Sequence, residues 1–221
     1  MKPALLACIA IVFTTGKGFS QQTVKGIQTE AETVVTNLYK RVIFLKPLGL
    51  PQGKELEAIR PSLSQDLLAR IRVAGECEKD YFRQYPDPDP KDPNAYILKP
   101  PFAWMETGLF SGGNEQADPF WFGVRRSESQ KDGSYEVRVK LKRWPEPDKY
   151  PRARGPMYDW TWEVVVFVIR DGNHLAVNDI YYPQVYPDNG EPRYPTVEKL
   201  RLSQLLGEGC KDGKWVGYSD R

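Results

Sequence analysis

One strand of the chain carries the residues that come closest to a catalytic pair. Alternation by two places four side chains on one face of that strand: Leu175, Val177, Asp179 and Tyr181. Burial among apolar groups would raise the pKa of the Asp179 carboxyl and suit it to general-base catalysis, with Tyr181 or Tyr158 as donor. We favour the structural alternative, in which Asp179 accepts from backbone donors or solvent and a bulge re-phases the strand.

Two further groups of side chains have types that could bind a ligand. Trp160 and Trp162 are spaced to share a strand face, as the wall of a ligand pocket or, more simply, as core. A loop between two predicted strands mixes basic and aromatic side chains: Arg143, Trp144, Tyr150, Arg152 and Arg154. This loop could hold an anionic partner, such as a polysaccharide or an acidic protein patch, although a solvated loop is the simpler interpretation.

Composition excludes several classes of function. The 221 residues include 31 Lys and Arg against 29 Asp and Glu, and such a balance argues against a nucleic-acid binder. The single histidine, His174, follows an Asp-Gly turn, where we expect an exposed position rather than a catalytic one. No Ser–His–Asp order, glycine-rich phosphate loop or CxxC motif occurs, and we expect neither a metal nor a cofactor.

Residues 1–20 have the order of a secretory signal peptide. A basic residue precedes an apolar run from Ala4 to Phe13, and small and polar residues follow up to Ser20. The run is too short to span a bilayer, which takes roughly 20 apolar residues. We therefore expect cleavage after Ser20, loss of Cys8 with the leader, and a periplasmic or secreted protein that has no membrane contact after cleavage.

The two remaining cysteines, Cys77 and Cys210, predict a disulfide in an oxidising compartment, against the alternative of two unrelated buried thiols. The leader contains Lys2 and Lys17, so the mature chain keeps 29 basic residues against 29 acidic ones. Its formal charge is therefore zero. Any argument for a polyanionic partner then depends only on the loop of basic and aromatic side chains described above.

The pattern of elements predicts an α+β fold in a single domain, residues 21–221. A capping box at Thr29 begins the first expected helix. The expected helices are 29–44, 54–59, a third from Ser62 to Tyr81 or Tyr85, and a last one from Thr196 or Val197 to Leu206. The expected antiparallel strands are 120–124, 135–141, the central 160–169 and the last, 174–182; Asp-Gly turns precede the second and the fourth of them. An irregular arm, 85–119, separates helices from sheet, and its part 99–110 is apolar enough to pack on the core.

The hairpin 162–182, with its ending Asn178-Asp179-Ile180, resembles the closing hairpin of the nuclear transport factor 2-like superfold, the cystatin-like fold that includes ketosteroid isomerase and the SnoaL-type cyclases. More narrowly, Lys99-Pro100-Pro101, Gly108–Ser111 and the segment from Leu202 through Cys210 to Tyr218 resemble an exported bacterial domain family of unknown function. The resemblance implies helices packed on a curved antiparallel sheet that forms a cone with a pocket. The pocket would be lined by Trp160, Trp162, Asp179 and Tyr181. The segment 144–156 would be an insertion between strands.

Together these features predict an exported, non-enzymatic binding domain. It would capture a small apolar ligand or a protein partner through the cone and the inserted loop, and inhibition of a secreted toxin or enzyme, an immunity-type role, is one such function. The alternative is a lyase or isomerase with Asp179 as general base. The oligomeric state does not follow from the sequence.

Overall fold

The computed structural model describes residues 18–86, 88–89, 92–96, 101–106, 108–112, 119–142, 161–183 and 200–218. Helices and an antiparallel sheet together make an α+β fold, as predicted. In this described part of the chain, no helix is both long enough and apolar enough to cross a membrane.

The first helix, α1, spans Gly18–Leu45, so Thr29 lies inside it and is not its N-cap. The capping-box prediction was wrong because residues 18–28 contain no proline and several good helix formers, which let the helix continue upstream. An apolar stripe at helical spacing is buried on α1, and it consists of Ala31, Val35, Leu38, Tyr39 and Val42.

Two helices follow α1, and both agree with the sequence pattern. Helix α2 spans Gly53–Ile59 and passes into the 3-10 turn η1, Arg60–Ser62, at Pro61. Helix α3 spans Gln65–Gln84, and Ser64 caps it by accepting a hydrogen bond from the backbone N–H of Leu67 at 3.1 Å.

The arm 85–119 contains more regular structure than expected. Strands β1, Pro88–Asp89, and β2, Asp92–Tyr96, pair as a short hairpin in place of a plain connector, and η2 spans Ala103–Glu106. The predicted packing of this arm on the core is confirmed, because Phe102, Trp104, Leu109 and Phe110 are all buried.

Five antiparallel strands form the main sheet in the order β3-β4-β5-β6-β7. Their bounds are β3 Trp121–Ser129, β4 Tyr135–Lys142, β5 Thr161–Asp171, β6 His174–Tyr182 and β7 Leu200–Arg201. The apolar strand β5 is central, as predicted, and the alternating side chains of β4 bury Tyr135, Val137, Val139 and Leu141. His174 is exposed beside the turn at Gly172, whose φ of 62° suits glycine.

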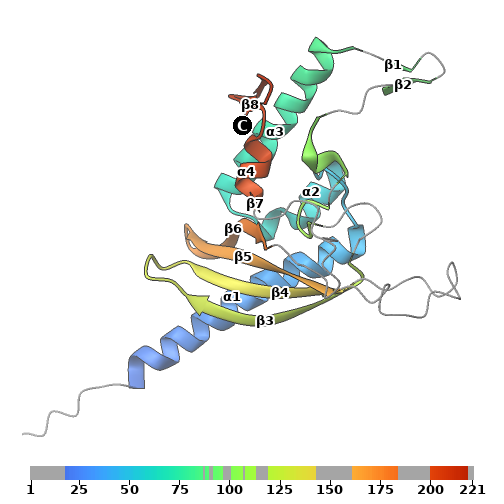
Figure 1. Ribbon diagram of the computed structural model, residues 1–221. Coiled ribbons are helices and arrows are strands. Elements are labelled where there is room, and N and C mark those ends of the chain that lie inside the picture. Colours follow the sequence, from blue (N-terminus) through green and yellow to red (C-terminus); the bar gives the residue numbers. More distant parts are fainter. Residues whose placement is uncertain are drawn as a thin grey trace, which may run out of the picture.

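The sheet differs from the prediction at both of its edges. Strand β3 continues to Ser129, because its later residues pair with β4 after a register shift at Arg125. The last helix, α4, spans Leu202–Gly207, and Leu200–Arg201 just before it pair with β6 as β7. Figure 1 shows α1 crossing one face of the sheet, while α3 and α4 stand together beyond the β6–β7 edge.

Candidate functional site

The interior between α1 and the sheet is filled by the segment Gly108–Gly112. Leu109 and Phe110 are fully buried in this segment. Three aromatic side chains, one each from α1, β5 and β6, donate hydrogen bonds to its consecutive carbonyl groups. The pairs are Tyr39 with Phe110 at 2.8 Å, Trp162 with Ser111 at 2.8 Å, and Tyr182 with Leu109. Because these buried donors and acceptors satisfy one another, the segment is a fixed part of the core.

Burial raises the pKa of both Tyr39 and Tyr182 far above the usual range, so both phenols remain protonated donors. Trp162 is buried within the same core, and its indole N–H is used inside the protein. Trp160, the other expected pocket-wall residue, lies outside the described residues, as does Tyr158. The described part of the interior is therefore occupied by the chain's own side chains.

Asp179 is out of phase with the core residues that precede it on β6. Phe167 pairs with Asp179, whereas the next residue, Val168, pairs with Val177, so Asn178 is an extra residue on β6. This bulge shifts the alternation of side chains by one. Asp179 and Tyr181 therefore do not share a face with Leu175 and Val177, and the bulge agrees with the structural alternative that we favoured for Asp179. The side chains of β6 that join the core are Leu175, Val177, Ile180 and Tyr182.

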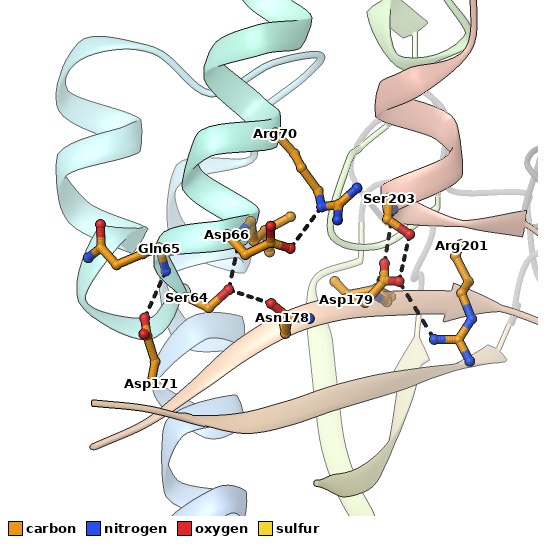
Figure 2. Close-up of polar contacts among 11 residues, drawn as sticks. Ser64, Gln65, Asp66, Arg70, Asp171, Asn178, Asp179, Arg201 and Ser203 are labelled. Carbon is orange, nitrogen blue, oxygen red and sulfur yellow. Dashed lines mark hydrogen bonds and ion pairs between the residues drawn. The ribbon is translucent and has the colours of Figure 1, made fainter. Parts of the chain in front are cut away.

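Both oxygens of Asp179 accept hydrogen bonds from groups near the start of α4 (Figure 2). Its Oδ1 accepts from the backbone N–H groups of Ile180 and Ser203, each at 2.9 Å. Its Oδ2 accepts from the Ser203 hydroxyl at 2.7 Å and lies 3.6 Å from Nη1 of Arg201. Arg201 is the N-cap residue of α4 and has no side-chain acceptor, so Asp179 supplies the missing cap from the neighbouring strand.

A parallel arrangement joins the start of α3 to the same sheet edge (Figure 2). The Ser64 hydroxyl donates to Oδ1 of Asn178 at 2.7 Å, and the Ser64 N–H donates to the carbonyl of Val177 at 2.9 Å. The N–H of Gln65 donates to the carboxylate of Asp171 at 2.8 Å. The bulge therefore presents polar groups that hold both helices on β6, which is a structural use of Asp179. Tyr181 is half-buried beside it and pairs in register with Arg201.

Cys77 and Cys210 form the predicted disulfide, with an S–S distance of 2.05 Å and a Cα–Cα distance of 5.9 Å. Cys77 lies fully buried on α3. Cys210 begins β8, Cys210–Lys211, which pairs with β9, Lys214–Trp215. The bond therefore fixes the C-terminal tail, defined here as Gly209–Tyr218, to the side of α3.

Trp215 is the anchor of the C-terminal tail. Its backbone N–H donates to Asp80 at 3.1 Å, and its carbonyl accepts from Gln84 at 3.3 Å. Its ring packs edge-on against Tyr81 at 5.4 Å and covers the backbone of Gly209. A Cβ atom on Gly209 would lie 2.2 Å from the Trp215 ring, and Gly209 has a φ of 70°, so both packing and conformation require glycine there.

These attachments leave an open groove of about 440 Å³ between α4 and the C-terminal tail. It is lined by Leu200, Ser203, Gln204, Gly207, Glu208, Gly209 and Tyr218. The volume falls within the usual range of ligand pockets. The sequence analysis did not predict this groove. The one sequence signal for a groove is that aromatic, carboxamide and glycine residues occur together around Cys210.

The predicted partner loop, with Arg143, Trp144, Tyr150, Arg152 and Arg154, lies outside the described residues, as does the whole insertion 144–156. Within the residues that are described, no group of three or more His, Cys, Asp or Glu side chains is placed to hold a metal ion. Comparisons of the chain with protein-family models, curated proteins and solved structures found no match.

Proposed function

We propose that the chain is an exported, non-enzymatic binding domain that holds a small ligand in the groove beside α4. The observation that carries the proposal is the groove itself, whose two walls are each anchored to the rest of the protein. Asp179 holds the start of α4, and the disulfide to Cys77 holds the C-terminal tail. A site with fixed walls loses less entropy when its ligand binds.

Three observations favour this groove over the interior as the binding site and argue against a catalytic role for Asp179. The interior is filled by Leu109 and Phe110, and the indole N–H of Trp162 is already bonded there. Asp179 uses both of its oxygens to hold α4, which leaves it poorly placed to accept a substrate proton. The lyase or isomerase alternative therefore gains no support from the geometry.

The finer fold assignment and the compartment belong to the same proposal. A helix across one face of a curved antiparallel sheet supports a nuclear transport factor 2-like cone, in this case with its interior filled. The disulfide supports export to an oxidising compartment after removal of residues 1–20.

A second candidate function, binding of a protein partner, is supported by the sheet face opposite α1. Trp121 is exposed there and lies over Gly123, and Phe167 and Tyr181 are only half-buried. Exposed aromatic side chains are typical of protein interfaces. Trp121→Ala would weaken a complex made by this face, whereas a change in the groove would leave that complex intact.

Filling the groove tests the proposed function. Gly207 lines the groove, has no positive φ, and has no atom within 4 Å of an added Cβ, so a Cβ fits there without strain. Gly207→Phe should therefore fold normally and abolish binding of small molecules that the wild-type protein binds in an NMR fragment screen. Gly207→Ala is the matched control and should keep most of that binding. If no fragment binds the wild-type groove, or if Gly207→Phe binds equally well, the proposal is wrong.

A further inference from the structure

We propose that the ligand of the groove is a neutral saccharide unit, an inference that rests on the function proposed above. Sugars present an apolar face of C–H groups together with hydroxyls that both donate and accept hydrogen bonds. The lining of the groove includes a matching set: an aromatic ring from the C-terminal tail, a carboxamide and a hydroxyl from α4, and two glycines.

The ring of Tyr218 is held in place as a wall. It packs at 87° against Trp215, with 5.4 Å between the ring centroids, and its hydroxyl donates to the carbonyl of Pro101. Partial burial and the neighbouring Tyr81 raise the pKa of Tyr218, so the phenol stays neutral and keeps this bond. Even so, Tyr218 remains 46% exposed. A ring that is fixed yet exposed provides a stacking surface that needs no ordering when a ligand binds.

Helix α4 provides the polar groups. Oε1 of Gln204 accepts from the backbone N–H of Arg201 at 2.8 Å, which orients the carboxamide and leaves its two N–H groups as donors. The hydroxyl of Ser203 donates to Asp179, so its oxygen can still accept. Gly207 adds no side chain to the lining, and no atom lies within 4 Å of a Cβ placed there, which allows close approach to the backbone.

The charge of the lining selects against other ligand classes. Among the described lining residues neither Lys nor Arg occurs, so a phosphate or a uronic acid would find no cationic side chain there. A Lys or Arg side chain as ligand offers only donors, so the N–H groups of Gln204 would face no acceptor. A purely apolar ligand would desolvate Gln204 and Ser203 without compensation. A neutral sugar avoids all three costs.

The test is a fluorescence and calorimetric titration of the full chain with four kinds of probe at millimolar concentration. They are the neutral disaccharides maltose, cellobiose and N,N′-diacetylchitobiose, the acidic digalacturonic acid, the peptide Gly-Lys-Gly, and decanoate. We expect saturable binding of at least one neutral disaccharide, which Trp215 behind the groove would report, and no binding of the other three kinds.

Two pairs of variants identify the contacts. Tyr218→Ala should weaken binding of the disaccharide by about tenfold, whereas Tyr218→Phe keeps the ring and should bind within about twofold of wild type. Gln204→Glu keeps the acceptor for Arg201 but removes the donors, so it should also weaken binding while the fold remains stable. Gln204→Leu removes the acceptor for Arg201 as well as the donors. Comparison of its stability and its binding with those of Gln204→Glu separates the loss of helix capping from the loss of ligand contact.

The outcomes separate this inference from the proposed function. Binding of Gly-Lys-Gly or decanoate in place of the neutral sugars, sensitive to Gly207→Phe, would overturn the saccharide assignment and leave the groove as a binding site. Sugar binding that Tyr218→Ala and Gln204→Glu do not change would overturn the assignment of these contacts. Failure of every probe here and of every fragment in the NMR screen would overturn both proposals.

Discussion

The disulfide between Cys77 and Cys210 should contribute a large part of the stability of the protein. The two cysteines are 133 residues apart in sequence, and the chain-entropy model assigns a crosslink of that span about 5 kcal/mol. Cys210→Ser removes the bond and leaves Cys77 as a small buried thiol, which creates little cavity. For a protein of this size, such a loss corresponds to a fall in Tm of about 10 to 20 °C.

Urea unfolding of wild type and Cys210→Ser measures this loss directly. Wild type treated with a reductant is the matched control and should fall to the stability of the variant, while the variant itself should not respond to the reductant. The near-ultraviolet circular dichroism of Trp215 should weaken with the loss of the bond, because the C-terminal tail then has only its packing and hydrogen bonds to hold it on α3. A loss below about 2 kcal/mol, the lower end of the usual range for a disulfide, would refute the reasoning.

Four other changes test particular contacts. Asp179→Asn removes the charge that caps α4 and should cost about 1 to 2 kcal/mol in urea unfolding; an unchanged stability would contradict its anchoring role. Tyr39→Phe removes only the hydroxyl that bonds the carbonyl of Phe110 and should cost about 1 to 2 kcal/mol, and the account of the filled interior fails if this loss is absent. Gly209→Ala should cost more than about 2 kcal/mol because of the Trp215 ring and the positive φ, whereas Gly207→Ala should be neutral or stabilising by up to about 1 kcal/mol; similar effects at both positions would be inconsistent with the packing described. Burial raises the pKa of Glu78 above its ordinary value of 4.5, so the folded protein holds that proton more tightly and loses stability as pH rises through and above 4.5; Glu78→Gln should lack this component when stability is compared across that range, and an identical pH profile would count against it.

Local sequence patterns predicted the elements because those elements obey local rules. The apolar residues of α1 and the alternation of β4 each follow one periodicity, and the structure buries side chains at those spacings. The disulfide followed from counting cysteines once the leader was set aside. The start of α1 was misplaced because a capping box is a local signal, and nothing upstream of Thr29 stops the helix.

The candidate site could not be predicted because it is made of long-range contacts. The bulge at Asn178 interrupts the alternation of β6, and a period of two cannot show where an extra residue lies. The filling of the interior depends on three aromatic donors from separate elements that converge on Leu109, Phe110 and Ser111. The groove depends on the disulfide and on Asp179, which join parts of the chain far apart in sequence.

The location of the bound ligand tests the central claim most directly. The indole N–H of Trp162 reports on the filled interior, whereas that of Trp215 lies behind the groove floor at Gly209. In a ¹H–¹⁵N NMR titration with a ligand that binds the protein, we expect shifts at the Trp215 indole and at the backbone amides of Ser203–Gly209 and Tyr218, with the Trp162 indole unchanged. A shift at the Trp162 indole, with the amides of α4 unmoved, would place the ligand inside the sheet and contradict the account.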